Sequence, residues 1–218
     1  NREREIRQLI ELLSKNEQAE YSELFIFSDG PKDDNDLTAV NRVRSYLDSI
    51  KDSTDFKDVR IYKSEVNKGL AASVISGVDR IIGQYGRVIV LEDDLKISKS
   101  FLLYMNLCLD RYRTDERIWS VCGYTPVLRT LEEHDADVYL SRRAFSTGWG
   151  TWSDRWERVE WDTGRLLKCI RNPVKRFKIC RGGNDLIEML VAQDRAQIDS
   201  WAVRWWCSQG LSDMFAVA

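Results

Sequence analysis

The chain has 218 residues, a length that suits one ordinary domain with a buried core. Hydrophobic residues make up 43% of the chain and charged residues 31%, which excludes a disordered or low-complexity protein. Thirty-three basic and 35 acidic residues leave a net charge of −2, so the overall charge does not favour nucleic acid as a partner.

No apolar run reaches the roughly 18 to 20 residues that span a bilayer, and the opening Asn-Arg-Glu-Arg-Glu is too charged for a signal peptide. The five cysteines include no Cys-x-x-Cys pair, which favours a reducing cytoplasmic location over a disulfide framework or zinc site. Peripheral contact with the inner face of the membrane stays open. With His134 as the single histidine, catalysis is expected to rest on carboxylates.

The first half of the chain alternates apolar runs with helical patterns. Apolar spacing predicts helices over 4–14, 36–50 (capped by Asp36), from 70 onward and from about 100 to 113. Short apolar runs predict strands at 24–27, 59–62 and 88–91. Three successive strand–helix units predict an α/β fold with a parallel sheet between helices.

The pattern changes after about residue 115. Strands are predicted at 118–121 and 138–140, and helices at 185–192 and 200–208, while the tryptophan-rich segment 144–161 reads as irregular. Because no repeat or flexible linker separates the halves, 1–115 and 116–218 are expected to form one continuous domain.

Three consecutive carboxylates, Glu92, Asp93 and Asp94, follow the apolar run at 88–91. They repel one another, and a hard cation such as Mg²⁺ or Mn²⁺, which takes oxygen ligands and bridges to phosphates, would relieve that repulsion. A solvated strand end that favours the next helix N-terminus is the alternative. Three acids directly after a fully apolar strand favour the metal site.

Two further segments lie where ligands bind in open α/β sheets, beyond the strand ends. Asp29-Gly30 could hydrogen-bond a base or ribose, and Asn67-Lys68-Gly69 could offer backbone N–H groups and a cation to a phosphate. Taken alone, each segment is better explained as a plain turn.

The stretch 145–152 combines Gly148 with Trp149 and other aromatic residues. Glycine allows the backbone to approach a ligand closely, and an aromatic face can stack on a sugar or base. A buried aromatic cluster that includes Trp156 and Trp161 explains the same residues equally well.

Asp199 precedes a predicted helix, and two interpretations are open. It could be the helix N-cap. It could instead be a general base whose pKa is raised by the apolar wall of Trp201. Arg204 is five residues away, which is not an ideal helical spacing for neutralising the acid.

Taken together, these segments resemble bacterial family-two glycosyltransferases with the GT-A fold, over roughly residues 22–208. The chain is also similar to the animal N-acetylglucosaminyltransferase I group, in which a strand ends in Glu-Asp-Asp-Leu. The matching segments, in chain order, are Phe27-Ser28-Asp29-Gly30, Asn67-Lys68-Gly69-Leu70, Val90-Leu91-Glu92-Asp93-Asp94-Leu95, Gly148-Trp149-Gly150-Thr151-Trp152 and Asp199-Ser200-Trp201.

The resemblance implies transfer of a sugar from a nucleotide diphosphate donor, usually a UDP-sugar, to an acceptor hydroxyl on a glycan or lipid-linked glycan, as in bacterial polysaccharide biosynthesis. It implies that Asp94 ligates Mn²⁺ or Mg²⁺ and that Glu92 and Asp93 contact the ribose and sugar of the donor. The metal assignment, and with it the whole sugar-transfer hypothesis, requires that Asp94 faces a cavity and is not locked to an arginine.

The resemblance further implies that Asp29 contacts the nucleoside. In inverting members of this family an acid near the later helix is the catalytic base of a single displacement. Asp199 matches that position best, with Asp194 and Asp185 as the next candidates.

Two departures from the family pattern concern the chain ends. Relatives begin with an apolar strand and a donor-binding loop, whereas this sequence begins in a charged helix; residues 209–218 also lack the relatives' Gly- and His-containing tail. We therefore expect a GT-A-type, mostly parallel sheet without its first strand, in a chain truncated at both ends. A non-catalytic nucleotide-sugar-binding module is one alternative, and a nucleotidyltransferase, whose Gly-rich basic loop is absent, is another.

Overall fold

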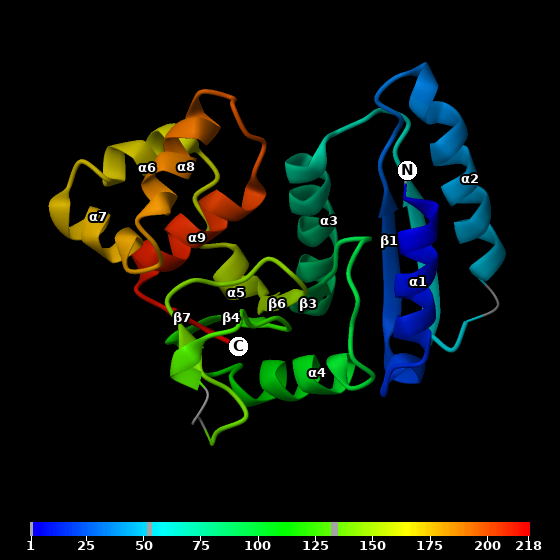
Figure 1. Cartoon of the computed structure of the whole chain (residues 1–218), viewed down its shortest axis with the longest axis horizontal. Coiled ribbons are helices and arrows are strands. Elements are labelled where there is room, and N and C mark those ends of the chain that lie inside the picture. The colour runs from blue at the N-terminus through cyan, green and yellow to red at the C-terminus, as the bar shows by residue number, and fades with distance from the viewer. Residues whose placement is uncertain (1, 52–53, 132–134) are drawn as a thin grey trace.

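The structure, a computed structural model, describes residues 2–51, 54–131 and 135–218, so His134 lies outside the described residues. The fold is α/β, with helices around two separate sheets (Figure 1). Within the described ranges no helix is both long enough and apolar enough to span a membrane.

The smaller sheet contains two parallel strands. Its unit consists of α1 (Glu3–Ser14), the 3-10 turn η1 (Ala19–Tyr21), β1 (Glu23–Ser28), α2 (Asp34–Ile50) and β2 (Asp58–Lys63). Glu23 is opposite Asp58 and Ser28 is opposite Lys63. The predicted strands at 24–27 and 59–62 are therefore confirmed, as is their parallel pairing.

The larger sheet has five strands in the order β3-β6-β4-β7-β5, and only β4 and β7 pair in parallel. Its elements, with the helices between them, are α3 (Leu70–Tyr85), β3 (Arg87–Val90), α4 (Phe101–Arg111), β4 (Ile118–Cys122), η2 (Arg129–Leu131), β5 (Leu140–Ser141), β6 (Trp149–Trp152) and β7 (Phe215–Val217). The expectation of one mostly parallel sheet is thus met only in part, by the small sheet of β1 and β2 and by the pair of β4 and β7. β3 joins a mixed sheet because β6, from the segment read as irregular, runs antiparallel between β3 and β4.

The second half of the chain ends in a helical layer beside the mixed sheet. It contains α5 (Ser153–Trp156), α6 (Thr163–Cys169), α7 (Pro173–Cys180), α8 (Asp185–Asp194) and α9 (Trp201–Ser212). The predicted helices at 185–192 and 200–208 are confirmed by α8 and α9. Leu166, Ile179 and Leu190 are buried between these helices, which gives the layer its own apolar core.

Two predicted helix caps differ from the structure. α2 is capped by Asp33, whose side chain accepts hydrogen bonds from the backbone N–H groups of Asn35 and Asp36, so Asp36 is not the cap. α9 is capped by Ser200, whose side chain accepts from Val203 N, so Asp199 is not an N-cap. The capping residue of α2 comes before the predicted Asp36, and that of α9 comes directly after Asp199. Helix ends are commonly displaced by a residue or two from where they are expected.

Candidate functional site

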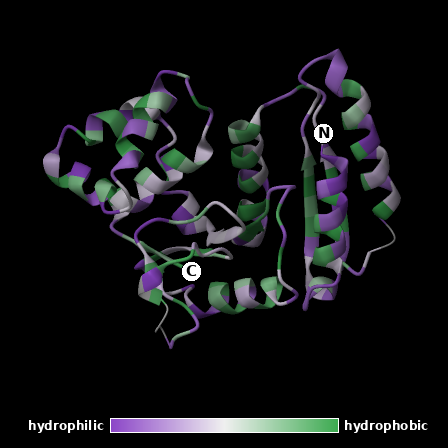
Figure 2. Cartoon of the chain, viewed as in Figure 1, coloured by the Kyte–Doolittle hydropathy of each residue, from purple (hydrophilic) through white to green (hydrophobic). Residues whose placement is uncertain are grey.

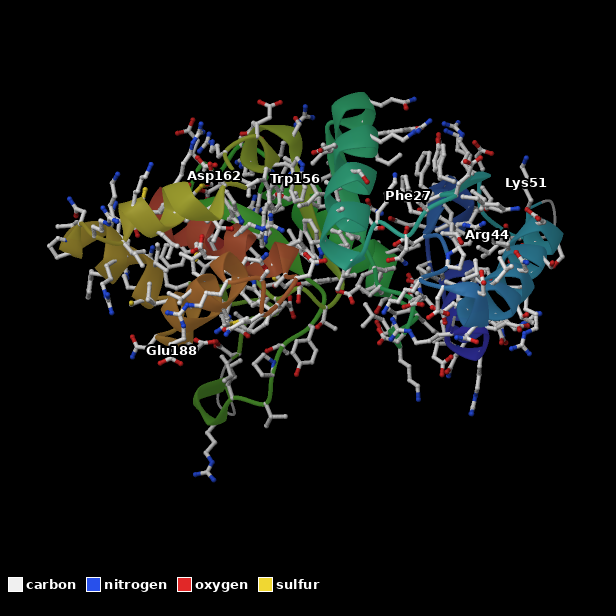
Figure 3. The ribbon with its side chains drawn as sticks, turned by 90° about the horizontal axis from the view of Figure 1, so that it is seen from above. Phe27, Arg44, Lys51, Trp156, Asp162 and Glu188 are labelled. Atoms are coloured by element: carbon white, nitrogen blue, oxygen red, sulfur yellow. The ribbon has the colours of Figure 1, made fainter. Side chains whose placement is uncertain are left out.

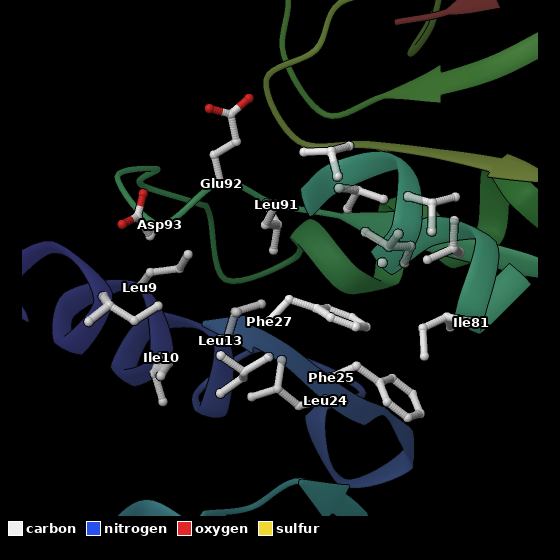
Figure 4. Close-up of a pocket in the computed structure, with 18 of the residues that line it drawn as sticks. Leu9, Ile10, Leu13, Leu24, Phe25, Phe27, Ile81, Leu91, Glu92 and Asp93 are labelled. Carbon is white, nitrogen blue, oxygen red and sulfur yellow. The ribbon is translucent and has the colours of Figure 1, made fainter. Parts of the chain in front are cut away.

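The carboxyl ends of β1 and β3 open onto a cavity of about 1220 Å³ that lies between the two sheets. We call it the inter-sheet cavity. Side chains of both edge strands line it, and Glu92 and Asp93 stand at one end of it (Figure 4). Asp29, Gly30 and Asn67 line it too, so the structure brings the predicted residues of three separate segments to one opening.

The Asp29 carboxylate joins the turn after β1 to the start of α3. It accepts hydrogen bonds from Gly30 N at 2.9 Å, from Lys68 N at 2.9 Å and from Gly69 N at 3.0 Å. These bonds use both carboxylate oxygens, so the turn interpretation accounts for much of what Asp29 does. A nucleoside contact would have to use its remaining lone pairs.

A second contact closes the same turn. Asn67 donates from Nδ2 to Gly30 O at 2.8 Å, which ties the loop before α3 to the loop after β1. A Cβ atom at Gly30 would lie 2.4 Å from the Val66 carbonyl carbon, so only glycine fits there. The predicted segments at 29–30 and 67–69 therefore form one unit.

Arg44 of α2 binds the backbone of the turn unit formed by residues 29–30 and 67–69. The sequence pattern does not predict this role. Its guanidinium donates to the backbone oxygens of Asp29 at 3.1 Å and Ser64 at 2.6 Å. Seen from above, Arg44 lies on the α2 side of β1, whereas Phe27 lies on the side that faces α3 (Figure 3). No motif marks such a residue, since its role depends on how α2 packs against the strand ends.

Asp199 lies beside the start of α3. Gly69 has a φ of +79°, and a Cβ atom built on it would be 3.1 Å from Asp199 Oδ2. Asp199 itself is exposed, so its carboxylate is available to solvent and ligand. The structure thus places the predicted base next to Lys68 and Gly69 and, through them, next to Asp29.

The charge of Asp199 acts on Arg204. Burial lowers the pKa of Arg204, and the negative charge of Asp199 partly offsets this effect. Among the described residues, Arg204 Nε is a buried donor with no hydrogen-bond partner, while its Nη1 donates to Trp161 O at 3.4 Å. Asp199 is therefore an acid with a cation nearby.

The three acids after β3 have different environments. Glu92 is half-buried, and burial raises its pKa above the ordinary range, with the charges of Asp94 and Asp93 adding to the effect. Asp93 and Asp94 are both ion-paired with Arg2 at the start of α1. Asp93 lines the inter-sheet cavity, but Asp94 is exposed and is not among the residues that line it.

The metal site expected at Asp94 does not have the arrangement that it requires. Within the described ranges, no group of three or more His, Cys, Asp or Glu side chains is placed to hold a metal ion. Carboxylate oxygens are suitable ligands for Mn²⁺ or Mg²⁺, but the Arg2 guanidinium already binds one oxygen of Asp93 and one oxygen of Asp94. A metal ion that used these two oxygens would have to displace Arg2.

Gly148 and Trp149 are part of the core. The Trp149 side chain is 1% exposed and stacks on Trp201 at 4.9 Å and Trp156 at 5.8 Å between ring centroids. Gly148 has a φ of +64°, and a Cβ atom there would lie 3.2 Å from the Phe101 ring. Of the two interpretations, the buried aromatic cluster describes these residues, and Trp149 offers no open face to a sugar.

The two other candidate bases are placed differently. Asp185, at the start of α8, is ion-paired with Arg143 at 2.8 Å. Asp194 is the last residue of α8 and is exposed. Neither shows a contact with the turn unit at 29–30 and 67–69, so Asp199 is the acid best placed beside it among the described residues.

We compared the chain with protein-family models, curated proteins and solved structures, and none of them matched it. Functional assignment therefore depends on the residues and their geometry. The geometry supports a site at the turn unit and Asp199, with the acids after β3 at the other side of the cavity opening.

Proposed function

We propose that the chain transfers a sugar from a nucleotide diphosphate sugar, with uridine as the expected base, to a hydroxyl group of a glycan or lipid-linked glycan. The observation that supports this proposal is the meeting of Asp29, Lys68–Gly69 and Asp199 at one place. The sequence alone predicts a role at the site for each of these segments. Asp29 and Asp199 are 170 positions apart in the chain. The proposal includes a GT-A-type arrangement of the strands around this site.

The proposed reaction is a single displacement. Asp199 accepts the proton of the acceptor hydroxyl, because its exposed carboxylate can reach a bound acceptor. The hydroxyl oxygen attacks the anomeric carbon, and the bond from that carbon to the diphosphate oxygen breaks with its electron pair leaving on the diphosphate. Attack from the opposite face inverts the anomeric configuration.

The donor would lie across the opening of the inter-sheet cavity. Lys68 offers its exposed ammonium group to a phosphate, as expected from its position before α3. Glu92, whose pKa is raised by burial, can donate a hydrogen bond to a sugar hydroxyl when it is protonated and accept one when it is ionised. A dependence on Mn²⁺ or Mg²⁺ at Asp94 stays part of the proposal and requires release of Arg2.

The test is a turnover assay with a panel of UDP-sugars and glycan acceptors, with and without Mn²⁺, and with the product anomer read by NMR. Asp199→Asn should lower turnover by about 100-fold or more, because a positioned general base contributes on this scale. Its donor affinity, measured by calorimetry, should stay near that of the unchanged chain.

Asp194→Asn is the matched control, since Asp194 is an exposed acid of the same layer that does not contact the turn unit. It should keep full turnover. Equal loss of donor binding and turnover in Asp199→Asn would assign that residue a structural role, and full turnover would exclude it as the base.

A non-catalytic nucleotide-sugar-binding module is the second candidate, and the pairing of Arg2 with Asp93 and Asp94 favours it. With both carboxylates occupied, the chain could hold a donor without activating its diphosphate. Saturable binding of a UDP-sugar with no detectable transfer to any acceptor would support this function over catalysis.

A further inference from the structure

Basic side chains are concentrated in one segment of the helical layer. Residues 163–184, which include α6 and α7, contain seven Lys or Arg residues and no Asp or Glu. They are Arg165, Lys168, Arg171, Lys175, Arg176, Lys178 and Arg181. The rest of the chain has the other 26 of the 33 basic residues and all 35 acidic residues, a net charge of −9. This segment, which we call the basic segment, therefore attracts anions locally although the protein as a whole does not.

Acidic neighbours neutralise only part of this charge. Arg165 pairs with acids that precede the segment, and Lys178 and Arg181 share the carboxylate of Asp213 at 3.8 and 3.0 Å. Asp213 also pairs with Arg142, so one acid faces three cations. The remaining four basic side chains are exposed, and none of them forms an ion pair within the described ranges. They are Lys168, Arg171, Lys175 and Arg176. The surface around α7 therefore keeps unpaired positive charge.

α7 buries one face and exposes the other. Ile179 is buried in the apolar core of the helical layer. On the opposite face, Val174 is 63% exposed and Phe177 is 67% exposed, although both are apolar. These two side chains are about one helical turn apart, and Lys178 and Arg181 follow Val174 at i+4 and i+7 on the same side of the helix. One helix face thus combines two protruding apolar side chains with cations.

The exposed face of α7 is ordered and accessible. Asn172 caps the helix, since its Oδ1 accepts hydrogen bonds from Val174 N at 2.9 Å and Lys175 N at 3.2 Å, and Pro173 occupies the first turn. Figures 1 and 3 show α7 at the end of the molecule farthest from α2. In Figure 2 hydrophilic and hydrophobic residues are interleaved at this end. A partner therefore reaches this face without moving other elements, and the face needs little ordering on binding.

Apolar and cationic side chains on one face suit an anionic bilayer. Its phosphate headgroups attract each Lys or Arg near the surface, and the region beneath them accepts apolar side chains. Long basic side chains lie along that boundary with their charges in water. Duplex nucleic acid would attract the same cations, but its phosphate backbone offers nothing apolar to Val174 or Phe177. The pair of exposed apolar residues therefore favours the lipid surface.

We propose that α7 docks the protein on a bilayer surface that contains anionic phospholipids. Val174 and Phe177 enter the headgroup region, and Arg171, Lys175 and Arg176 contact the lipid phosphates around them. A single weak signal gives only marginal attachment to a membrane, so the docking is reversible and depends on both the charges and the apolar pair. This inference does not rest on the proposed function, since α7 contributes no residue to the turn unit or to the inter-sheet cavity.

The test is sedimentation of the 218-residue chain with large unilamellar vesicles in about 0.1 M salt, where surface charges still act over about 10 Å. We expect the chain to bind vesicles of phosphatidylcholine with about 30% phosphatidylglycerol at least about 10-fold more tightly than vesicles of phosphatidylcholine alone. Binding should weaken when the salt concentration is raised to about 0.5 M, because the lipid and protein charges are then screened from one another.

A pair of double variants tests the charges. Lys175→Ala combined with Arg176→Ala should lower the partition coefficient for the anionic vesicles about 25-fold, because each cation near such a surface contributes about 5-fold. Arg42→Ala combined with Lys51→Ala is the matched control. It removes two exposed positive charges from the α2 end of the molecule and should leave the partition coefficient within about 2-fold, because these charges lie well beyond the screening length.

A pair of single variants tests the apolar contribution. Phe177→Ala should lower the partition coefficient about 10-fold, the scale for one aromatic side chain that no longer leaves water. Tyr21→Ala is the control, because it removes another exposed aromatic ring that lies outside the basic segment, and it should have no effect. Since all these side chains are exposed, thermal unfolding of each variant should match that of the unchanged chain.

Absence of vesicle binding, or equal binding to neutral and anionic vesicles, would overturn the proposal, as would anionic binding that the α7 variants leave unchanged. Tighter binding to duplex DNA than to the anionic vesicles, lost in the Lys175→Ala and Arg176→Ala variant but not in Phe177→Ala, would assign the basic segment to nucleic acid and would also overturn it. Because every readout is binding or unfolding, absence of sugar transfer would not affect the result, and absence of vesicle binding would leave the test of sugar transfer unaffected.

Discussion

At the residue scale, the four acids near the cavity opening lie in three different environments. Backbone N–H groups surround Asp29, an arginine pairs with Asp93 and Asp94, and Glu92 is half-buried beside both of them. Only the pairing with Arg2 blocks the ligand role that the sequence implies for Asp94. The exposure of that ion pair matters here, because exposed pairs contribute little to stability and are readily exchanged for another cation.

Arg2→Ala should therefore increase affinity for Mn²⁺. Removing the guanidinium leaves Asp93 and Asp94 uncompensated next to Glu92, and a divalent ion would relieve that repulsion. We expect at least a several-fold lower dissociation constant, measured by electron paramagnetic resonance of free Mn²⁺. Arg4→Ala, which removes a charge two positions away, is the control, and equal Mn²⁺ affinity in all three proteins would argue against a metal at Asp94.

Asp115 gives a prediction about pH. Its hydrogen bonds with Arg117, together with that charge, lower the pKa of Asp115 to about 2 from 3.8. A depressed pKa of this kind stabilises the fold above the unfolded-state pKa, and the contribution is lost as pH falls from about 4 toward about 2. Asp115→Asn should thus be less stable than the unchanged chain at pH 7.

The difference in unfolding midpoint should shrink as pH falls through that window, because protonation removes the charge that the variant already lacks. Denaturant unfolding between pH 7 and pH 2 measures it. Asp137→Asn removes one exposed carboxylate elsewhere and corrects for net charge. A difference that stays constant down to pH 2 would contradict the assigned stabilisation.

At the element scale, the start of α3 is a tightly constrained point of the site. Gly69 has a φ of +79°, a Cβ atom on it would lie 3.1 Å from Asp199 Oδ2, and its N–H is bound to Asp29. A side chain at this position meets both backbone strain and a close contact. The loop before α3 therefore depends on glycine for its conformation and for the approach of Asp199.

Gly69→Ala should destabilise the fold by about 1–3 kcal/mol, the scale of cost for a residue held in a sparsely populated backbone region. It should also displace Asp199. Thermal or denaturant unfolding measures the stability. Gly83→Ala is the matched control, because Gly83 is in the same helix and a Cβ there meets nothing within 4 Å. Equal stability of the two variants would contradict the constraint at Gly69.

Elements with a strong apolar pattern were predictable, and so was the pairing of β1 with β2, but the partner of β3 was not. β1 and β3 follow from continuous apolar runs, and β2 follows from Val59, Ile61 and Tyr62. β6 was missed because Gly150 interrupts the strand-favouring Trp149, Thr151 and Trp152, and it is a strand because it pairs with β3 and β4. The short helices α6 and α7 were missed too, although the caps Asp162 and Asn172 and the Pro173 at the start of α7 were visible signals.

The site, too, could be predicted from the sequence only in part. Asp29, Gly69 and Asp199 were each identifiable from their positions after strands or before helices, and the structure brings them together. The Arg2 pairing was not predictable, since it joins residues about 90 positions apart through the packing of α1. As a tryptophan, Trp149 could stack on a ligand or belong to the core. Its contacts with Trp201 and Trp205 decide for the core.

At the scale of the whole molecule, few contacts hold the smaller sheet beside the mixed one across the inter-sheet cavity. Asn16, after α1, is buried and makes two of them. Its Oδ1 accepts from Leu102 N at 2.8 Å, and its Nδ2 donates to Ser98 O at 2.8 Å. Glu17 N also donates to Lys99 O at 3.0 Å. These bonds anchor α1 to the start of α4 and thereby fix the width of the cavity.

Asn16→Ala should destabilise the protein by about 1–3 kcal/mol, because it leaves Leu102 N and Ser98 O without that partner in a buried place. The loss of stability should be greater in the smaller sheet than in the mixed sheet. β1 and β2 should open before the mixed sheet, so hydrogen exchange of their amides should accelerate more than that of β4, which is fully buried. Asn41→Ala, on the exposed face of α2, is the matched control and should change neither. If Asn16→Ala accelerates exchange equally in β1 and β4, the two sheets unfold as one unit, and the cavity is not a boundary between them.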